Sequence, residues 1–227
     1  MITRTTNQTL ARNAQQNLQA NMSRMAKLQE QVSSSTAITR PSDNPAGTAD
    51  ALKVRAEIRA NAQYSSNIND ADGWLTTVDS ALDNTTDLMR RIKDLALRGA
   101  SAGLSPANKD AVATELEGLK QDLLKEANTT FAGRSVFAGN SNAKGAFTEV
   151  NGEFVHSGSG AGVMRRVDGG APVRVDADGS AVFGSGPGSV FALVDSLAAD
   201  LRSGADVTGH LASIDARVST ILSRHTE

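Results

Sequence analysis

The chain has 227 residues, a formal net charge of −2 at pH 7 and no cysteine. The absence of cysteine excludes disulfides, thiol nucleophiles and thiolate metal sites. The near-neutral charge gives no sign of a nucleic-acid partner, and no apolar run has the length needed to cross a membrane. Aromatic residues make up only 4% of the chain, which argues against a thick globular core.

The first segment predicts a polar helix over residues 5–33. Its apolar stripe is narrow, and asparagine and glutamine occupy much of the remaining surface. Such a helix buries too little apolar area to be stable alone, so we expect residues 1–40, a polymerisation helix, to be disordered until a partner covers them. An ordinary amphipathic helix on a domain surface is the alternative. The residues of the stripe are Leu18, Met22, Met25, Leu28 and Val32.

A helix break and a new helix start follow. Pro41 keeps the residue before it out of the α region. Asn44 is a natural N-cap, and Pro45 fits the first helical position, where its missing N–H costs nothing. From Pro45 the helical pattern continues without another proline to about Arg98, which would make a rod of roughly 80 Å.

Within that rod, apolar residues step by three and four positions from Ile68 to Ala96. This spacing keeps one seam of a helix against a partner helix, as in coiled coils. A second row at seven-residue spacing, which begins at Trp74, suits a helix with more than one neighbour. The seam residues predicted to pack are Ile68, Leu75, Val78, Leu82, Met89 and Ile92.

A third helix is predicted to start at Ser105 and Pro106, after a short glycine-containing loop. Because this loop is short, the second and third helices should lie antiparallel. Residues 41–130, together with 204–227, are predicted to form the helical rod domain. The buried stripe of the third helix is expected to contain Val112, Leu116, Leu119 and Leu123.

Residues 131–203 predict a β-rich outer domain that ends in a return helix. Phe147–Val150 and Glu153–His156 flank Asn151-Gly152, a pair typical of a tight hairpin turn. Further short strands are expected at 163–167, 173–175 and 181–183.

The last segment again steps by three and four residues, and its predicted packing residues are Leu211, Ile214, Val218 and Ile221. The chain stops at Glu227 in mid-pattern, so we expect a C-terminal polymerisation helix to be missing after it. The predicted fold class is mainly α with a small β insertion. Long antiparallel helical rods would form a coiled-coil bundle, with a compact β domain at the tip.

No pattern in the chain predicts a catalytic, cofactor or metal site. Its three histidines lie apart in the sequence, and none has a partner at metal-ligand spacing. Asp176-Ala177-Asp178-Gly179 resembles half of a calcium loop, but without the remaining ligands a β-turn is the expected structure. We therefore expect the protein not to be an enzyme.

Three motifs resemble one family. Residues 40–46 (Arg-Pro-Ser-Asp-Asn-Pro-Ala) are similar to the N-terminal region of bacterial flagellin-type axial proteins, and most to the hook-associated protein 3, or hook–filament junction, family. Residues 133–139 (Gly-Arg-Ser-Val-Phe-Ala-Gly) are similar to the segment that leads into the β domain of that family, and residues 178–184 to the end of that domain.

The resemblance implies a structural adaptor with a flagellin-like fold and no cofactor. Its partners would be hook-associated protein 1, flagellin, further copies of itself in a ring, and a flagellar export chaperone. It also implies export through the flagellar type III apparatus to the extracellular flagellum. A short flagellin filament subunit and a secreted coiled-coil adhesin or binding module remain as alternatives.

Overall fold

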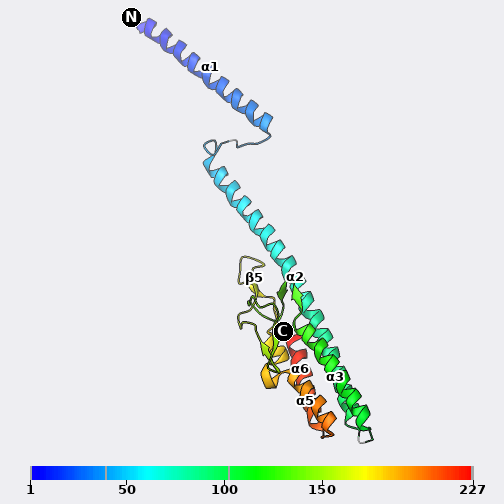
Figure 1. Cartoon of the computed structure of the whole chain (residues 1–227). Helices are drawn as coiled ribbons and strands as arrows, with labels where there is room; N and C mark the ends of the chain where they lie inside the picture. The colour runs from blue at the N-terminus through cyan, green and yellow to red at the C-terminus, as the bar shows by residue number, and fades with distance from the viewer. Residues whose placement is uncertain (1, 39, 102, 226–227) are drawn as a thin grey trace. The chain divides into compact units, whose positions relative to one another are not determined.

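The computed structural model describes the backbone of residues 2–38, 40–101 and 103–225, and side chains from residue 7 onward (Figure 1). The chain divides into two compact units, residues 1–62 and 63–227. It is mostly helical, with three small antiparallel sheets, which confirms the predicted fold class. The predicted domain boundaries after residues 40, 130 and 203 stay predictions. None of the described helices is long and apolar enough to cross a membrane.

The first unit contains α1 (Ile2–Ser34) and the beginning of α2 (Pro45–Gly99). Helix α1 ends where Ser35 adopts a left-handed φ of 52°. The predicted start of α2 is confirmed, because the Asn44 side-chain oxygen accepts a hydrogen bond from the Gly47 amide at 2.9 Å. This bond satisfies one of the amides left without a partner in the first turn of a helix.

The second unit combines the remainder of α2 with α3 (Pro106–Ala127), α5 (Val190–Ser203) and α6 (Thr208–His225), which lie side by side in Figure 1. Helix α3 runs antiparallel to α2, as its short connecting loop predicts, and packs along α5. Arg91 of α2 bonds Glu115 of α3 at 2.6 Å, and Lys93 of α2 bonds Asp215 of α6 at 2.5 Å. Helix α2 therefore contacts two other helices.

The predicted start of α3 is also confirmed. Ser105 accepts a hydrogen bond from the Asn108 amide at 3.3 Å, and Pro106 occupies the first helical turn. The predicted stripe of α3 faces the core. Its buried members are Val112, Leu116, Leu119 and Leu123.

Three separate two-stranded sheets follow α3. Strand β1 (Thr130–Phe131) pairs with β2 (Arg134–Ser135), β3 (Phe147–Val150) with β4 (Glu153–His156), and β5 (Met164–Arg165) with β6 (Val173–Arg174). The β3–β4 hairpin has the predicted bounds. Its turn residues, Asn151 and Gly152, have φ values of 55° and 82°, as a type I′ turn requires.

The expected strand at 181–183 is wrong, because these residues belong to the short helix α4 (Gly179–Phe183). Asp178 caps α4 by accepting a hydrogen bond from the Ser180 amide at 2.9 Å. The apolar residues Val182 and Phe183 of this helix are fully buried. A run of only three apolar residues has no period that distinguishes a strand from a helical turn. The strands expected at 163–167 and 173–175 shorten to β5 and β6.

The β-turn expected at Asp176–Gly179 is also wrong, because Gly179 is the first residue of α4 and Asp178 is its N-cap. Asp176 accepts a hydrogen bond from the Val163 amide at 2.6 Å and binds Arg174 at 3.0 Å, while Asp178 serves as the cap of α4. Burial by itself raises the pKa of Asp178, but hydrogen bonds from Ser180 and Ala181, together with the electrostatic effect of the nearby His156, hold it below its ordinary value. Both carboxylates therefore have structural partners.

Five of the six phenylalanines form one cluster beneath the sheets. Phe183 lies at the centre, with ring centroids 5.1 Å from Phe137, 5.5 Å from Phe147 and 6.0 Å from Phe191. Phe154 packs on Phe191 at 4.8 Å. Such edge and offset contacts add to the free energy gained by burying the rings. The scarce aromatic residues are therefore concentrated where the sheets alone would be too small to form a core.

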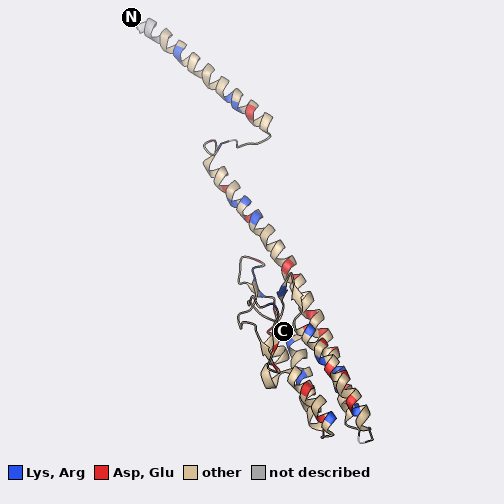
Figure 2. Ribbon diagram, in the orientation of Figure 1, with Lys and Arg blue, Asp and Glu red and all other residues tan. Residues whose placement is uncertain are grey.

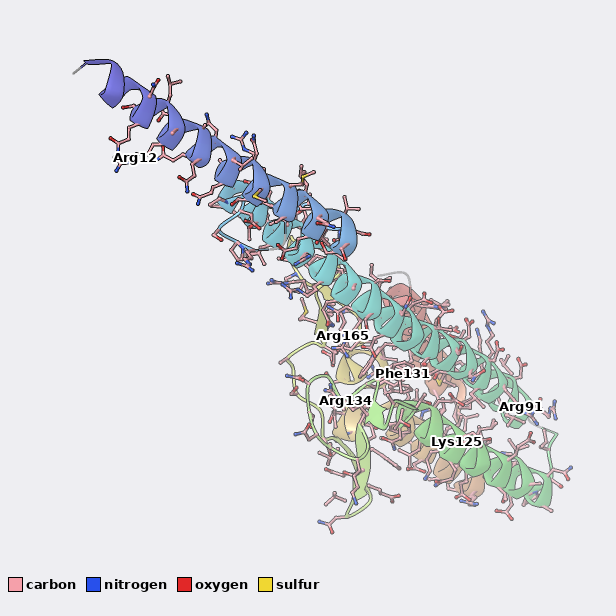
Figure 3. The ribbon with its side chains drawn as sticks, turned by 90° about the horizontal axis from the view of Figure 1, so that it is seen from above. Arg12, Arg91, Lys125, Phe131, Arg134 and Arg165 are labelled. Carbon is pink, nitrogen blue, oxygen red and sulfur yellow. The ribbon has the colours of Figure 1, made fainter. Side chains whose placement is uncertain are left out.

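The sixth phenylalanine, Phe131, attaches the β1–β2 hairpin to α2. Its ring contacts Trp74 edge to face at 5.8 Å, and it lies so close to Gly73 that a Cβ there would meet it at 2.8 Å. The guanidinium groups of Arg134 and Arg165 lie 5.6 and 5.8 Å from the Trp74 ring, at cation–π distance (Phe131, Arg134 and Arg165 are labelled in Figure 3). Gly73 weakens the helix locally, but its lack of a side chain makes room for the Phe131 ring.

A further ion-pair network joins α5 to α3. Arg202 donates to Glu117 at 2.6 and 3.1 Å and to Asp110 at 3.0 Å. The hydrogen bond from Arg202 lowers the pKa of Glu117. Paired charges of this kind favour the ionised carboxylate in the folded state.

We expect Ile92→Asp to unfold the second unit, because Ile92 is 0% exposed and the new carboxylate would be buried without a partner. The free energy of unfolding should fall by more than about 3 kcal/mol. Thermal unfolding followed by circular dichroism measures this change. The matched control is Ile68→Asp, on the same predicted seam but 47% exposed, which should leave the melting temperature almost unchanged. Equal effects of the two substitutions would contradict the burial pattern.

The stabilisation from the Glu117–Arg202 pair should be lost in acid. Because the folded-state pKa of Glu117 lies below its ordinary value of 4.5, this contribution is present above that pH and disappears as the pH falls through the lowered pKa. Glu117→Gln should therefore reduce the difference in melting temperature between pH 7 and pH 3. Glu149→Gln, which removes an exposed carboxylate from β3, is the control and should leave that difference unchanged.

Candidate assembly surface

The apolar stripe of α1 is exposed along its whole described length. At about 100° per residue, Leu18, Met22, Met25, Leu28 and Val32 fall within an arc of about 120° on one side of the helix. These side chains are 61–79% exposed, and Leu10 on the same side is 63% exposed. An exposed stripe of large apolar side chains is typical of a surface that another protein covers.

Few charged residues interrupt this surface. Figure 2 shows a helix α1 that is mostly uncharged where it is described, with most of its Lys, Arg and Glu residues gathered toward its C-terminal end. Among the side chains of α1 that the structure describes, the charges lie outside the apolar arc, since Arg12, Arg24, Lys27 and Glu30 are all rotated by about 120° or more from Leu18. Lys27 binds Asp43 at 2.9 Å. The stripe is therefore flanked by amides and neutral side chains, which can form hydrogen bonds with a partner without burying charge.

The predicted helix-break residues lie on the surface of the first unit. Pro41, Asn44 and Pro45 are all exposed, and Asn44 caps α2. The Asp43 side chain accepts a hydrogen bond from the Arg40 amide at 3.1 Å. These contacts set the backbone of the turn between the two helices.

Three more exposed apolar residues, not predicted from the sequence, lie at the beginning of α2, where Val54 and Ile58 share one side of the helix and Leu52 lies on the opposite side. Leu52, Val54 and Ile58 are 56%, 52% and 61% exposed. The four-residue step from Val54 to Ile58 was the available signal, but alanines and charged residues around it hide the stripe. We include these residues with the α1 stripe in the candidate assembly surface.

The predicted seam of α2 divides into buried and exposed parts. Val78, Leu82, Met89 and Ile92 are buried. On α6, Ile214 and Ile221 are buried, while Leu211 and Val218 are half-buried beside the core.

Two seam residues, Ile68 and Leu75, were expected to face a partner helix but are 47% and 48% exposed. Ile68 precedes Ala71, where the buried face of α2 begins. Leu75 lines a cavity of about 560 Å³ instead, together with Asp178 and His225. These two positions are therefore not buried within the chain, and their packing in an assembly stays a prediction.

The structure also brings together charged groups that the sequence analysis kept apart. His225 of α6 lies between two carboxylates of α2, with Nε2 2.5 Å from Asp79 and Nδ1 3.7 Å from Asp83. The spacing of these residues along the chain gave no sign of this cluster, in which one ligand atom from each residue lies within 4.8 Å of the others. These residues could contact a cation, but the carboxylates are 61% and 68% exposed and the imidazole already bonds Asp79. A hydrogen bond between α6 and α2 accounts for this arrangement.

The model of the bacterial flagellin N-terminal helical region matches residues 6–142, more than half of the chain. The chain belongs to this family. The matched region contains all of α1 after its first four residues, together with α2 and α3, and so includes the whole candidate assembly surface.

Similar proteins include two kinds of flagellar subunit. A flagellin of Clostridium tyrobutyricum is 31% identical over 121 residues, which cover 53% of this chain and 32% of that protein. The flagellar hook-associated protein 3 of Escherichia coli (strain K12) is 27% identical over 160 residues, which cover 70% of this chain and 50% of that protein. The chain therefore spans half or less of the length of these curated relatives.

The fold is also found in a solved structure. The flagellar junction protein FlgL from Legionella pneumophila superimposes with a TM-score of 0.67 at 16% identity, over 81% of this chain and 92% of that one. This likeness confirms the flagellin-like fold.

Removal of residues 1–32 should barely change the melting temperature of the remaining chain. The described apolar side chains of α1 are exposed, so their deletion removes almost no buried area. A change of less than about 2 °C in a calorimetric scan is the expected result. A fall of many degrees would mean that α1 stabilises the rest of the fold and does not serve as a free assembly surface.

Proposed function

We propose that this chain is a structural adaptor of the bacterial flagellum, which joins the hook to the flagellin filament. The observation on which this depends is the exposed apolar stripe of α1, in a chain whose second unit already has a complete core. The stripe is not needed to fold that core. It is available for neighbouring subunits.

The adaptor role is favoured over a filament role by the match to hook-associated protein 3, which covers more of this chain than the match to flagellin does. The Pro-Ser-Asp-Asn-Pro sequence at residues 41–45 supports the same choice through its resemblance to the junction family. In the structure it forms the capped turn before α2.

The partners we propose are hook-associated protein 1 on one side, flagellin on the other, and copies of this chain in a ring. Each would cover part of the α1 stripe or the apolar group at Leu52, Val54 and Ile58. Burial of such side chains contributes about 1.5–3 kcal/mol for each large residue, so a few of them supply substantial binding energy. Export through the flagellar type III apparatus, with the help of a chaperone, and an extracellular position belong to this proposal.

The second candidate is a short flagellin, and the 31% identity to a flagellin is the observation in its favour. A filament subunit polymerises with itself without limit, whereas an adaptor stops after a short layer. Electron microscopy of the purified full-length protein distinguishes the two, because long filaments from this protein alone would favour the flagellin role.

Deletion of the gene should leave cells with hooks but no filaments, and flagellin should accumulate in the medium. A copy with Leu18→Asp should fail to restore the filaments, because the charge lies in the middle of the α1 stripe. Filament counts by electron microscopy and flagellin blots of the medium measure both effects.

The matched control is Ala20→Asp, which adds the same charge on the opposite side of α1, about 200° from Leu18. This variant should restore filaments to the normal number, and both variants should be exported in equal amounts. Normal filaments in the deletion strain would refute the adaptor role. Equal behaviour of the two variants would refute the assignment of the stripe.

A further inference from the structure

Two of the five methionines of the chain lie in the middle of the α1 stripe. Met22 and Met25 are 67% and 71% exposed. They are rotated about 40° and 20° to either side of Leu18, so both thioethers lie on the surface proposed for assembly. By contrast, Met89 is fully buried in the core of the second unit, and Met164 on β5 is 48% exposed but far from α1 in sequence.

An exposed thioether reacts with peroxides. In this reaction the methionine sulfur is oxidised by two electrons and takes one oxygen atom from hydrogen peroxide, which is reduced to water; the product is a sulfoxide. The sulfoxide oxygen is a strong hydrogen-bond acceptor in place of an apolar group. Buried without a donor, it loses its hydration without compensation.

We propose that Met22 and Met25 form an oxidation site, and that their conversion to sulfoxides prevents α1 from packing against neighbouring flagellar subunits. This inference rests on the proposed function of the α1 stripe. Modification is confined to the time before assembly, since a neighbour that covers the stripe also shields the two sulfur atoms. Methionine sulfoxide reductases reverse the reaction, so the block is reversible.

The structure supplies an internal comparison for the chemical step. When the folded chain is treated with hydrogen peroxide, peptide mass spectrometry should find Met22 and Met25 oxidised at least about tenfold faster than Met89, with Met164 also reactive. Oxidation of Met22 and Met25 at the slow rate of Met89 would overturn the proposal, whatever the function of the chain.

Binding to purified flagellin and to purified hook-associated protein 1, followed by co-sedimentation, tests the consequence. Peroxide treatment should weaken binding of the chain by at least about tenfold, and methionine sulfoxide reductase should restore it. The double variant Met22→Leu/Met25→Leu keeps the apolar volume and should bind normally after the same treatment. Met164→Leu is the control and should remain as sensitive as the unaltered chain.

Each outcome has a distinct meaning. Normal binding by a chain with both sulfoxides in place would overturn the oxidation block and leave the adaptor role intact. Failure of the untreated chain to bind either partner would instead contradict the proposed function, and with it the effect assigned to oxidation. Equal sensitivity of the double leucine variant would mean that another residue is responsible.

Discussion

The second unit depends on one buried face of α2, from Ala71 to Gly99. The face meets the β region at Trp74, and ion pairs at Arg91 and Lys93 join the same part of the helix to α3 and α6. At its end, Gly99 lies so close to Leu201 of α5 that a Cβ there would approach that side chain to 2.5 Å. Because α3, α5, α6 and the β1–β2 hairpin all contact this part of α2, a charge placed in its buried face would disturb several elements at once.

Features encoded by neighbouring residues could be predicted from the sequence. The three-and-four spacing of α2 and α3 identifies the buried faces because side chains one turn apart share a side of a helix. Asn44 and Ser105 marked two helix starts, because short polar side chains satisfy the first amides of a helix. The Asn151-Gly152 pair fixed the hairpin bounds through its positive φ angles.

Features that depend on distant residues could not be predicted in this way. The five-ring cluster joins Phe137 to Phe191 across more than fifty positions, and composition alone suggested no such core. His225 meets Asp79 only because α6 returns beside α2. Ile68 and Leu75 continue a perfect seam, yet burial of this face begins only after Ile68, and Leu75 borders a cavity where no other element covers it. Periodicity shows which face of a helix is apolar but not how far along it a partner extends.

The spacing of apolar residues in α1 likewise does not show whether a partner covers the stripe. Helices α1 and α2 have similar spacing of apolar residues, but one face is buried within the chain and the other is exposed. A stripe of five large apolar residues on a helix rich in amides is too narrow to hold a stable core by itself. The stripe is nevertheless apolar enough to bind a partner that offers a complementary apolar face. A surface that is weak alone and strong when covered suits a subunit that stays separate during transport and becomes ordered where its neighbours are already in place. The amides beside the stripe reinforce this, because they form hydrogen bonds with water before assembly and with neighbours after it.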